Sequence, residues 1–243
     1  MEKEEGGGTP VSDILDPARN AERRQAVLDK ARRSMGVQPD NANRLQAVRN
    51  RLAMHPDGLV PARGQLERGD RITLFQTMAE AVSATVARVP SYDDIPREIA
   101  SYLRETNLPQ RLRHGDDPRL ADLDWSSQRT MEVTRGIAEN ATEVGLSHAF
   151  GGVAESGTLV LTSGQDNPTT LNFLPENHIV VLQGDHVAGD YETVLERIRE
   201  RYGNGEMPRT VNMITGPSRS GDIEQKLLLG AHGPRRLHII IVE

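Results

Sequence analysis

The sequence predicts an α/β fold, with a mostly parallel sheet covered by helices on both faces and a helical N-terminal extension. Two observations indicate this class. Helical apolar spacings fill the chain up to about residue 107, whereas short and nearly continuous apolar runs, separated by Gly, Pro and Asn, follow later. Strands that are apolar along their whole length suit a parallel sheet buried on both faces. The 243 residues suffice for one substantial core.

The N-terminal region begins with a predicted disordered tail at residues 1–12, which are charged and Gly-rich and lack periodic apolar positions. From Asp13 to about Met35 the apolar spacings predict a helix with a narrow apolar stripe. A second short helix is predicted around residues 45–52, where three apolar residues fall on one side.

Two further helices complete the mainly helical region 13–107, which we expect to pack on the sheet of an α/β domain at residues 108–243. Asp93-Asp94-Ile95-Pro96 is typical of a helix start, with acidic side chains near the positive end of the dipole and Pro in the first turn. The other helix is predicted from unbroken apolar spacings of 3 and 4 at Ile72, Phe75, Ala79, Val82, Val86 and Val89.

Four apolar runs in the second half are predicted to be buried strands. They lie at residues 157–161, 178–182, 210–214 and 237–242. The amphipathic segment Tyr191 to Tyr202 is predicted to be a crossover helix between parallel strands.

Composition excludes several classes of function. The formal net charge is -6, and Lys and Arg are interleaved with Asp and Glu, so no basic surface for nucleic acid is predicted. One Trp, four Tyr and three Phe are too few for a base-stacking platform. The absence of Cys excludes Cys-ligated iron–sulfur clusters and a Cys nucleophile from these residues. We expect no cofactor in this chain.

The expected location is the cytoplasm. The N-terminus lacks the apolar core of a signal peptide, and no apolar run approaches the roughly 18 residues that a membrane span needs.

The best local candidate for a binding site is the turn that follows the strand at 210–214. Free backbone N–H groups would converge there if a helix begins near Asp222, and Gly216, Ser218, Arg219 and Ser220 would add a tight turn, hydroxyl donors and a guanidinium. We therefore predict an anion site for a carboxylate or phosphate. The alternative is a capped turn with a solvent-facing Arg.

Two other turns could carry chemistry. Gly157 and Thr158 follow Glu155, so the backbone could approach a ligand closely and present Glu155 as a base or nucleophile. His232 directly precedes Gly233 and Pro234 in a second turn, where an imidazole could orient a substrate. The alternatives are a tight turn with a solvated Glu155 and a His232 bonded to the local backbone.

No metal site is predicted. The seven histidines show neither an i,i+4 pair nor HExxH spacing, and the cluster His114 to Asp117 is interpreted as a loop ahead of Pro118. No standard phosphate loop for a dinucleotide or ATP is present.

Three segments taken together resemble a known family. They are 154–161 (AESGTLVL), 174–181 (LPENHIVV) and 215–235, in which the turn TGPSRSGDIE is followed by GAHGPR. In this order they resemble the LUD domain of lactate utilisation protein C, over about residues 130–243. Ser220-Gly221 stands where the family usually has Thr-Ala, which keeps a hydroxyl.

The resemblance implies a fold similar to that of CoA transferases, sugar-phosphate isomerases and formyltetrahydrofolate cyclo-ligase. It also implies a role in oxidising L-lactate to pyruvate alongside iron–sulfur partner proteins. Two alternatives stay open: a stand-alone enzyme of the CoA-transferase or phosphosugar-isomerase type that uses Glu155, and a non-catalytic docking or regulatory subunit.

Overall fold

The computed structural model describes residues 16–38, 40–221 and 227–243, so the tail predicted at residues 1–12 lies outside the described residues. The chain divides into two compact units, with the division after Pro56. The N-terminal unit contains α2 (Pro17–Ser34) and α3 (Ala42–Met54), which confirm the two helices predicted there. Asp16 and Asn41 cap these helices through their side chains, and neither helix has a buried residue. No helix in the described ranges is long and apolar enough to cross a membrane.

The second unit is built on a parallel six-stranded sheet, which confirms the predicted fold class. The strand order is β1-β12-β7-β4-β2-β3, and every neighbouring pair is parallel. The strands are β1 (Thr85–Val89), β2 (Arg111–His114), β3 (Glu132–Arg135), β4 (Val144–His148), β7 (Asn177–Gln183) and β12 (Arg236–Val242). Two of the predicted strands, at 178–182 and 237–242, are central in it as β7 and β12.

A smaller sheet has the order β8-β5-β6-β9. Its strands are β5 (Gly151–Val153), β6 (Thr158–Thr162), β8 (Val187–Ala188) and β9 (Val211–Ile214). The predicted strands at 157–161 and 210–214 thus form β6 and β9 here instead of joining the parallel sheet. For β6 the reason is the tight connection from β5, because a short turn can join only antiparallel strands, and β9 in turn pairs with β6 in the antiparallel direction.

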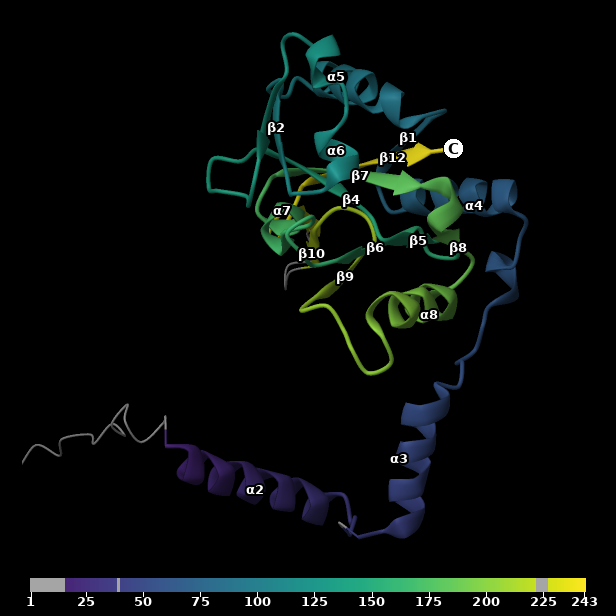
Figure 1. The fold of residues 1–243 in the computed structure, drawn as a ribbon, viewed down its shortest axis with the longest axis vertical. Coiled ribbons are helices and arrows are strands. Elements are labelled where there is room, and N and C mark those ends of the chain that lie inside the picture. The colour runs from purple at the N-terminus through teal and green to yellow at the C-terminus, as the bar shows by residue number, and fades with distance from the viewer. Residues whose placement is uncertain (1–15, 39, 222–226) are drawn as a thin grey trace, which may run out of the picture. The chain divides into compact units, whose positions relative to one another are not determined.

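The layers stack around the parallel sheet (Figure 1). Helices α5 (Ile95–Glu105) and α6 (Pro118–Ala121) cover one face, while α4 (Arg68–Ala81) and the smaller sheet cover the other. Helix α8 (Tyr191–Tyr202) packs on the outer side of the smaller sheet. Along β7, Ile179 and Val181 face α5, whereas Val180 and Leu182 face α4, so both faces of the strand are buried.

The single helix predicted over residues 72–89 is wrong in its second half. Helix α4 ends at Ala81, Ser83 has a positive φ of 72°, and the chain continues as β1 along β12. Val86 and Val89 pack in the cores on opposite faces of the sheet, as residues an odd number apart do in a strand. Their spacing of three therefore imitated a helical repeat by coincidence, and β-branched residues favour the strand.

Two further predicted helices are confirmed, but one of them connects other strands than expected. Helix α5 and helix α8 confirm the predicted helices near residues 95 and 191–202, but α8 connects β8 to β9 of the smaller sheet and is not a crossover in the parallel one. Residues 57–107 belong to the same compact unit as the rest of the sheet, so the unit begins before the predicted boundary at residue 108.

Candidate ligand-binding site

The predicted turn after β9 is held against the turn between α4 and β1. Gly216 has a φ of 73°, and a Cβ there would lie 2.5 Å from the carbonyl oxygen of Val82, so the position accepts only glycine. The Nη2 group of Arg219 donates to the same carbonyl oxygen and, at 2.7 Å, to Ser83 Oγ. Part of the guanidinium that we expected to face a ligand therefore fastens this turn.

The turn is also bonded to the second predicted segment, 230–235. Ser218 N donates to Pro234 O at 2.8 Å, and Gly230 N donates to Ser218 O at 3.0 Å. His232 N donates to Ser218 Oγ at 3.3 Å, which leaves the hydroxyl hydrogen of Ser218 able to donate elsewhere. The structure thus brings Gly216, Ser218, Arg219 and His232 together, although they come from two separate stretches of sequence.

These residues surround a cavity of about 280 Å³, which we call the GPS cavity after Gly216-Pro217-Ser218. This volume suits a small molecule rather than a dinucleotide. Phe173 and Met213 form part of its wall and are partly exposed. The lining residues are Asn172, Phe173, His178, Met213, Ile214, Thr215, Gly216, Pro217, Ser218, Arg219, His232, Gly233, Pro234 and Leu237.

A buried polar group that no sequence pattern indicated also lines this cavity. His178 is the second residue of β7, and Asn172 belongs to the short helix α7 (Thr169–Phe173). Both touch Ser147 of β4: His178 Nε2 lies 3.0 Å from Ser147 Oγ, and Ser147 Oγ donates to Asn172 Oδ1 at 3.0 Å. The three side chains are almost fully buried.

Two atoms of this group have no partner among the described residues. They are His178 Nδ1 and Asn172 Nδ2. Buried polar atoms are normally hydrogen-bonded, so an unpaired pair beside a cavity indicates a place where a ligand or water binds. Burial lowers the pKa of His178 to about 3, so its imidazole is neutral at pH 7.

Glu155 and Gly157 lie elsewhere. Glu155 is buried, and its Oε2 lies 3.7 Å from Nε of Arg63. Gly157 has a φ of 65°, and a Cβ there would lie 2.3 Å from Ala79 N, so this glycine permits close packing against α4. Neither residue lines the GPS cavity. The role of Glu155 as a base or nucleophile stays a prediction.

Two of the remaining predicted positions, Thr158 and Ser220, are close to the turn. Thr158 Oγ1 is hydrogen-bonded to Thr215 Oγ1 at 2.7 Å and to Tyr191 Oη at 2.9 Å, so it links the start of the turn to β6 and α8. Ser220 lies in β10 (Arg219–Gly221), which pairs with β11 (Leu227–Leu229). Asp222, where a helix was expected to begin, lies outside the described residues.

A second cavity, of about 650 Å³, lies at the carboxyl ends of β2, β4 and β7, and we call it the strand-end cavity. Its lining includes Asp117, Arg119, His148, Asn167 and His186. Parallel sheets commonly bind ligands at this edge. Sequence patterns indicated only a loop for the segment ending at Asp117, because the short and partly charged strand β2 before it gives no clear strand pattern.

Two groups that line the strand-end cavity, Asp117 and His148, are hydrogen-bonded to neighbouring residues, whereas Asn167 Oδ1 has no partner among the described residues. Asp117 accepts hydrogen bonds from Arg119 N, Nε and Nη2, at 2.9, 2.9 and 2.6 Å. Burial alone would raise the pKa of Asp117, but these bonds hold it below its usual value. Burial lowers the pKa of His148 to about 4. His148 Nδ1 bonds the carbonyl of Ala149 at 2.9 Å, and its Nε2 lies 2.7 Å from Tyr92 Oη.

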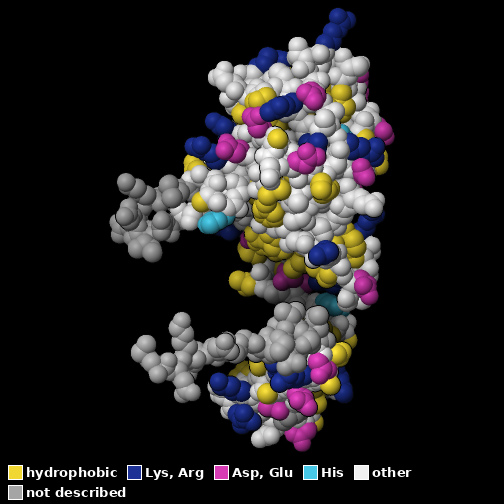
Figure 2. Space-filling view, turned by 90° about the vertical axis from the view of Figure 1, so that its left-hand side faces the viewer, with side chains coloured by type: hydrophobic (Ala, Val, Ile, Leu, Met, Phe, Trp, Pro, Cys, Tyr) yellow, Lys and Arg dark blue, Asp and Glu magenta, His cyan; other side chains and the backbone are white. Residues whose placement is uncertain are grey.

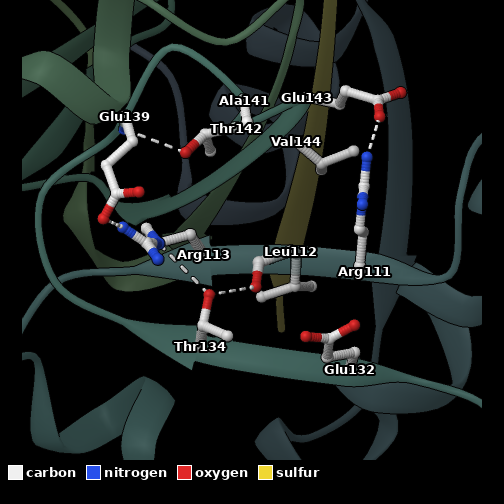
Figure 3. Close-up of a pocket in the computed structure, with 10 residues that line it drawn as sticks. All are labelled: Arg111, Leu112, Arg113, Glu132, Thr134, Glu139, Ala141, Thr142, Glu143 and Val144. Atoms are coloured by element: carbon white, nitrogen blue, oxygen red, sulfur yellow. Dashed lines mark hydrogen bonds and ion pairs between the residues drawn. The ribbon is translucent and has the colours of Figure 1, made fainter.

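A third pocket, lined by residues of β2, β3 and the segment before β4, contains two Arg and three Glu, and both Arg are paired with a Glu (Figure 3). Arg111 pairs with Glu143, and Arg113 pairs with Glu139 at 2.5 Å. Over the face drawn in Figure 2, Lys and Arg side chains likewise alternate with Asp and Glu. Within the described ranges no group of three or more His, Cys, Asp or Glu could hold a metal ion.

The fold is that of an α/β protein, and the GPS cavity is lined by residues of both the parallel sheet and the smaller mixed sheet. The LUD domain family model matches residues 72–242, so the chain belongs to the LUD domain family. The match includes β1 and starts before residue 108, where we expected the domain to begin.

Several relatives carry the name lactate utilization protein C. One from Geobacillus sp. (strain WCH70) is 29% identical over 228 residues, which cover 82% of this chain and 93% of the relative. Another from Geobacillus thermodenitrificans is 32% identical over 144 residues, which cover 52% of this chain and 60% of the relative. The crystal structure of a DUF162 family protein from Deinococcus radiodurans shares the fold, with a TM-score of 0.56 and 20% identity over 73% of this chain and 99% of that one.

Proposed function

We propose that this chain works in the use of L-lactate and binds a small carboxylate, L-lactate or its oxidation product pyruvate, in the GPS cavity. The pathway is suggested by relatives named lactate utilization protein C, one of which matches over 93% of its length. The observation that carries the binding site is the pair of unpartnered buried atoms, His178 Nδ1 and Asn172 Nδ2, beside a cavity of about 280 Å³.

The lining of the GPS cavity offers suitable chemistry for a carboxylate. Asn172 Nδ2 and the Ser218 hydroxyl can donate to its oxygens, and Arg219 supplies positive charge next to the same turn. Apolar side chains such as Phe173, Met213 and Leu237 suit the carbon skeleton.

The proposal also requires partner proteins that accept the electrons from L-lactate. Oxidation of L-lactate to pyruvate releases two electrons and two protons, and these 243 residues have no Cys to ligate an iron–sulfur cluster through thiolates. We therefore propose that iron–sulfur partner proteins accept the electrons while this chain handles the acid. Docking through residues 1–60 stays a prediction, tested by asking whether partners still co-purify after those residues are deleted.

The direct test is calorimetric titration of the full chain with L-lactate and with pyruvate at pH 7. We expect Arg219→Ala to weaken binding by about 1.5–3 kcal/mol, the scale of a charge-assisted hydrogen bond. Arg104→Ala, on the exposed side of α5, is the matched control and should bind like the wild type. Absence of binding by the wild type would remove the proposed site, and unchanged binding by Arg219→Ala would remove Arg219 from it.

The pathway is tested separately by growth. A strain that lacks this gene should fail on L-lactate as sole carbon source, grow on glucose, and recover on lactate when the intact protein is supplied. Normal growth of the deletion strain on lactate would contradict the proposed pathway.

A further inference from the structure

Resting on the proposed function, we infer that the GPS cavity selects the 2-hydroxy acid over the 2-oxo acid, because His178 Nδ1 is a fixed hydrogen-bond acceptor that the substrate hydroxyl satisfies. L-Lactate would then be the preferred ligand, and pyruvate the one released. His178 acts here as a specificity-determining residue for binding.

The first step is the tautomer of His178. Ser147 Oγ donates its only hydrogen to Asn172 Oδ1 at 3.0 Å. The contact of 3.0 Å between Ser147 Oγ and His178 Nε2 must therefore use a hydrogen on the imidazole, so Nε2 donates. A neutral imidazole carries one hydrogen, which leaves Nδ1 with a lone pair. Burial lowers the pKa of His178 to about 3, which keeps the ring neutral at pH 7.

The second step is the amide of Asn172. Because its Oδ1 accepts from Ser147, the Nδ2 group of the same side chain carries two hydrogens for donation. Nδ2 is buried and unpartnered, as is His178 Nδ1. The hydrogen bonds from His178 to Ser147 and from Ser147 to Asn172, which we call the relay, thus leave two atoms without a partner. One is an acceptor and the other a donor, and both belong to side chains that line the GPS cavity.

The third step is the fit to the ligand. A 2-hydroxy acid carries a hydroxyl donor next to a carboxylate acceptor, which complements His178 Nδ1 and Asn172 Nδ2. A 2-oxo acid presents a carbonyl lone pair to the lone pair of Nδ1 and leaves that nitrogen unsatisfied. Sites that hydrogen-bond a substrate hydroxyl reject analogues without the donor, because a buried polar group is then left unpaired.

The test compares L-lactate and pyruvate in titrations of the full wild-type chain. We expect L-lactate to bind at least about tenfold more tightly, the scale of one unsatisfied buried group. Equal affinities, or tighter binding of pyruvate, would overturn this inference and leave the proposed function intact. Binding of neither acid would overturn both.

A variant isolates the relay. In Ser147→Ala the imidazole and the cavity wall remain, but nothing fixes the tautomer of His178, so the preference for L-lactate should fall toward parity. Ser101→Ala, on helix α5, removes an exposed serine hydroxyl bonded to Glu105 and should leave the preference unchanged. A preference that survives in a folded Ser147→Ala protein would contradict the role of the relay.

A spectroscopic measurement on the wild type does not depend on a variant that folds. In protein labelled with ¹⁵N-histidine, His178 should show the Nε2–H tautomer at pH 7, and its Nδ1 resonance should shift with L-lactate more than with pyruvate. An Nδ1–H tautomer, or equal shifts with the two acids, would overturn the assignment of Nδ1 as the acceptor.

Discussion

Tyr92 Oη lies 2.7 Å from His148 Nε2, which ties the segment after β1 to the carboxyl end of β4. His148 Nδ1 is 2.9 Å from the carbonyl of Ala149, so Nδ1 carries the hydrogen of the neutral ring and Nε2 accepts from the tyrosine. The rim of the strand-end cavity is thereby fixed by a bond from the segment after β1 to the end of β4, two strands that are not neighbours in the sheet.

Removing this bond should destabilise the fold measurably. We expect Tyr92→Phe to lower the free energy of unfolding by about 1 kcal/mol, because a buried histidine nitrogen loses its donor. Tyr202→Phe is the control, since Tyr202 also lines the strand-end cavity but its hydroxyl has no hydrogen bond within the described ranges. Urea denaturation at pH 7 measures both, and equal stabilities of the two variants would contradict the role of the Tyr92 hydroxyl.

Stability should also fall in mild acid. Burial lowers the pKa of His148 to about 4 and that of His178 to about 3, from an ordinary value of 6.5. As the pH falls, the unfolded chain therefore takes up these protons first. The stabilisation is complete above pH 6.5 and is lost below it, by about 2 kcal/mol for each histidine between pH 7 and pH 5.

Urea denaturation at pH 7 and pH 5 checks this dependence. In His148→Gln the loss of stability between the two pH values should be smaller by about 2 kcal/mol than in the wild type. His232→Gln changes an exposed histidine and should retain the wild-type loss. Identical losses in the wild type and in His148→Gln would show that His148 is not the group that titrates.

The central strands and the helices with clear end signals could be predicted from the sequence. β7 and β12 are apolar over most of their length, and α8 begins at the capping residue Asp190. Strands β2 and β3 could not be recognised, because each has only four residues and carries charged side chains. In β1 the valine spacing matched a helix, and only pairing with β12 decides between the two structures.

Some residues of the candidate site could likewise be predicted from the sequence, and others could not. The turns at Gly216 and at residues 230–235 could be found because Gly, Pro and Ser mark them in the sequence. His178 could not, because a histidine within an apolar run gives no sign of its partner. Its relay depends on the register that sets Gly145 opposite His178 and brings Ser147 alongside, which is a property of the folded sheet.

The buried ion pair of Asp117 and Arg119 should contribute more to the free energy of unfolding than the exposed ion pair of Asp116 and Arg135. Asp117 is buried and accepts three hydrogen bonds from Arg119, so Asp117→Asn should cost about 2 kcal/mol by removing the charge that Arg119 faces. Asp116→Asn breaks an exposed ion pair with Arg135 and should cost less than about 1 kcal/mol. Equal costs in urea denaturation would show that burial adds nothing to the Asp117 pair.

Gly216 has both a positive φ and no room for a Cβ, whereas Gly205 has a positive φ but open space around it. Gly205 has a φ of 83° with no neighbouring atom within 4 Å of a Cβ, so Gly205→Ala should cost about 1 kcal/mol from backbone conformation alone. At Gly216 the φ is 73° and a Cβ would also meet Val82 O at 2.5 Å, so Gly216→Ala should cost about 3 kcal/mol. Because the turn lines the GPS cavity, Gly216→Ala should weaken L-lactate binding as well, whereas Gly205→Ala should not. Equal stability losses in urea would mean that the turn moves away from α4 without cost.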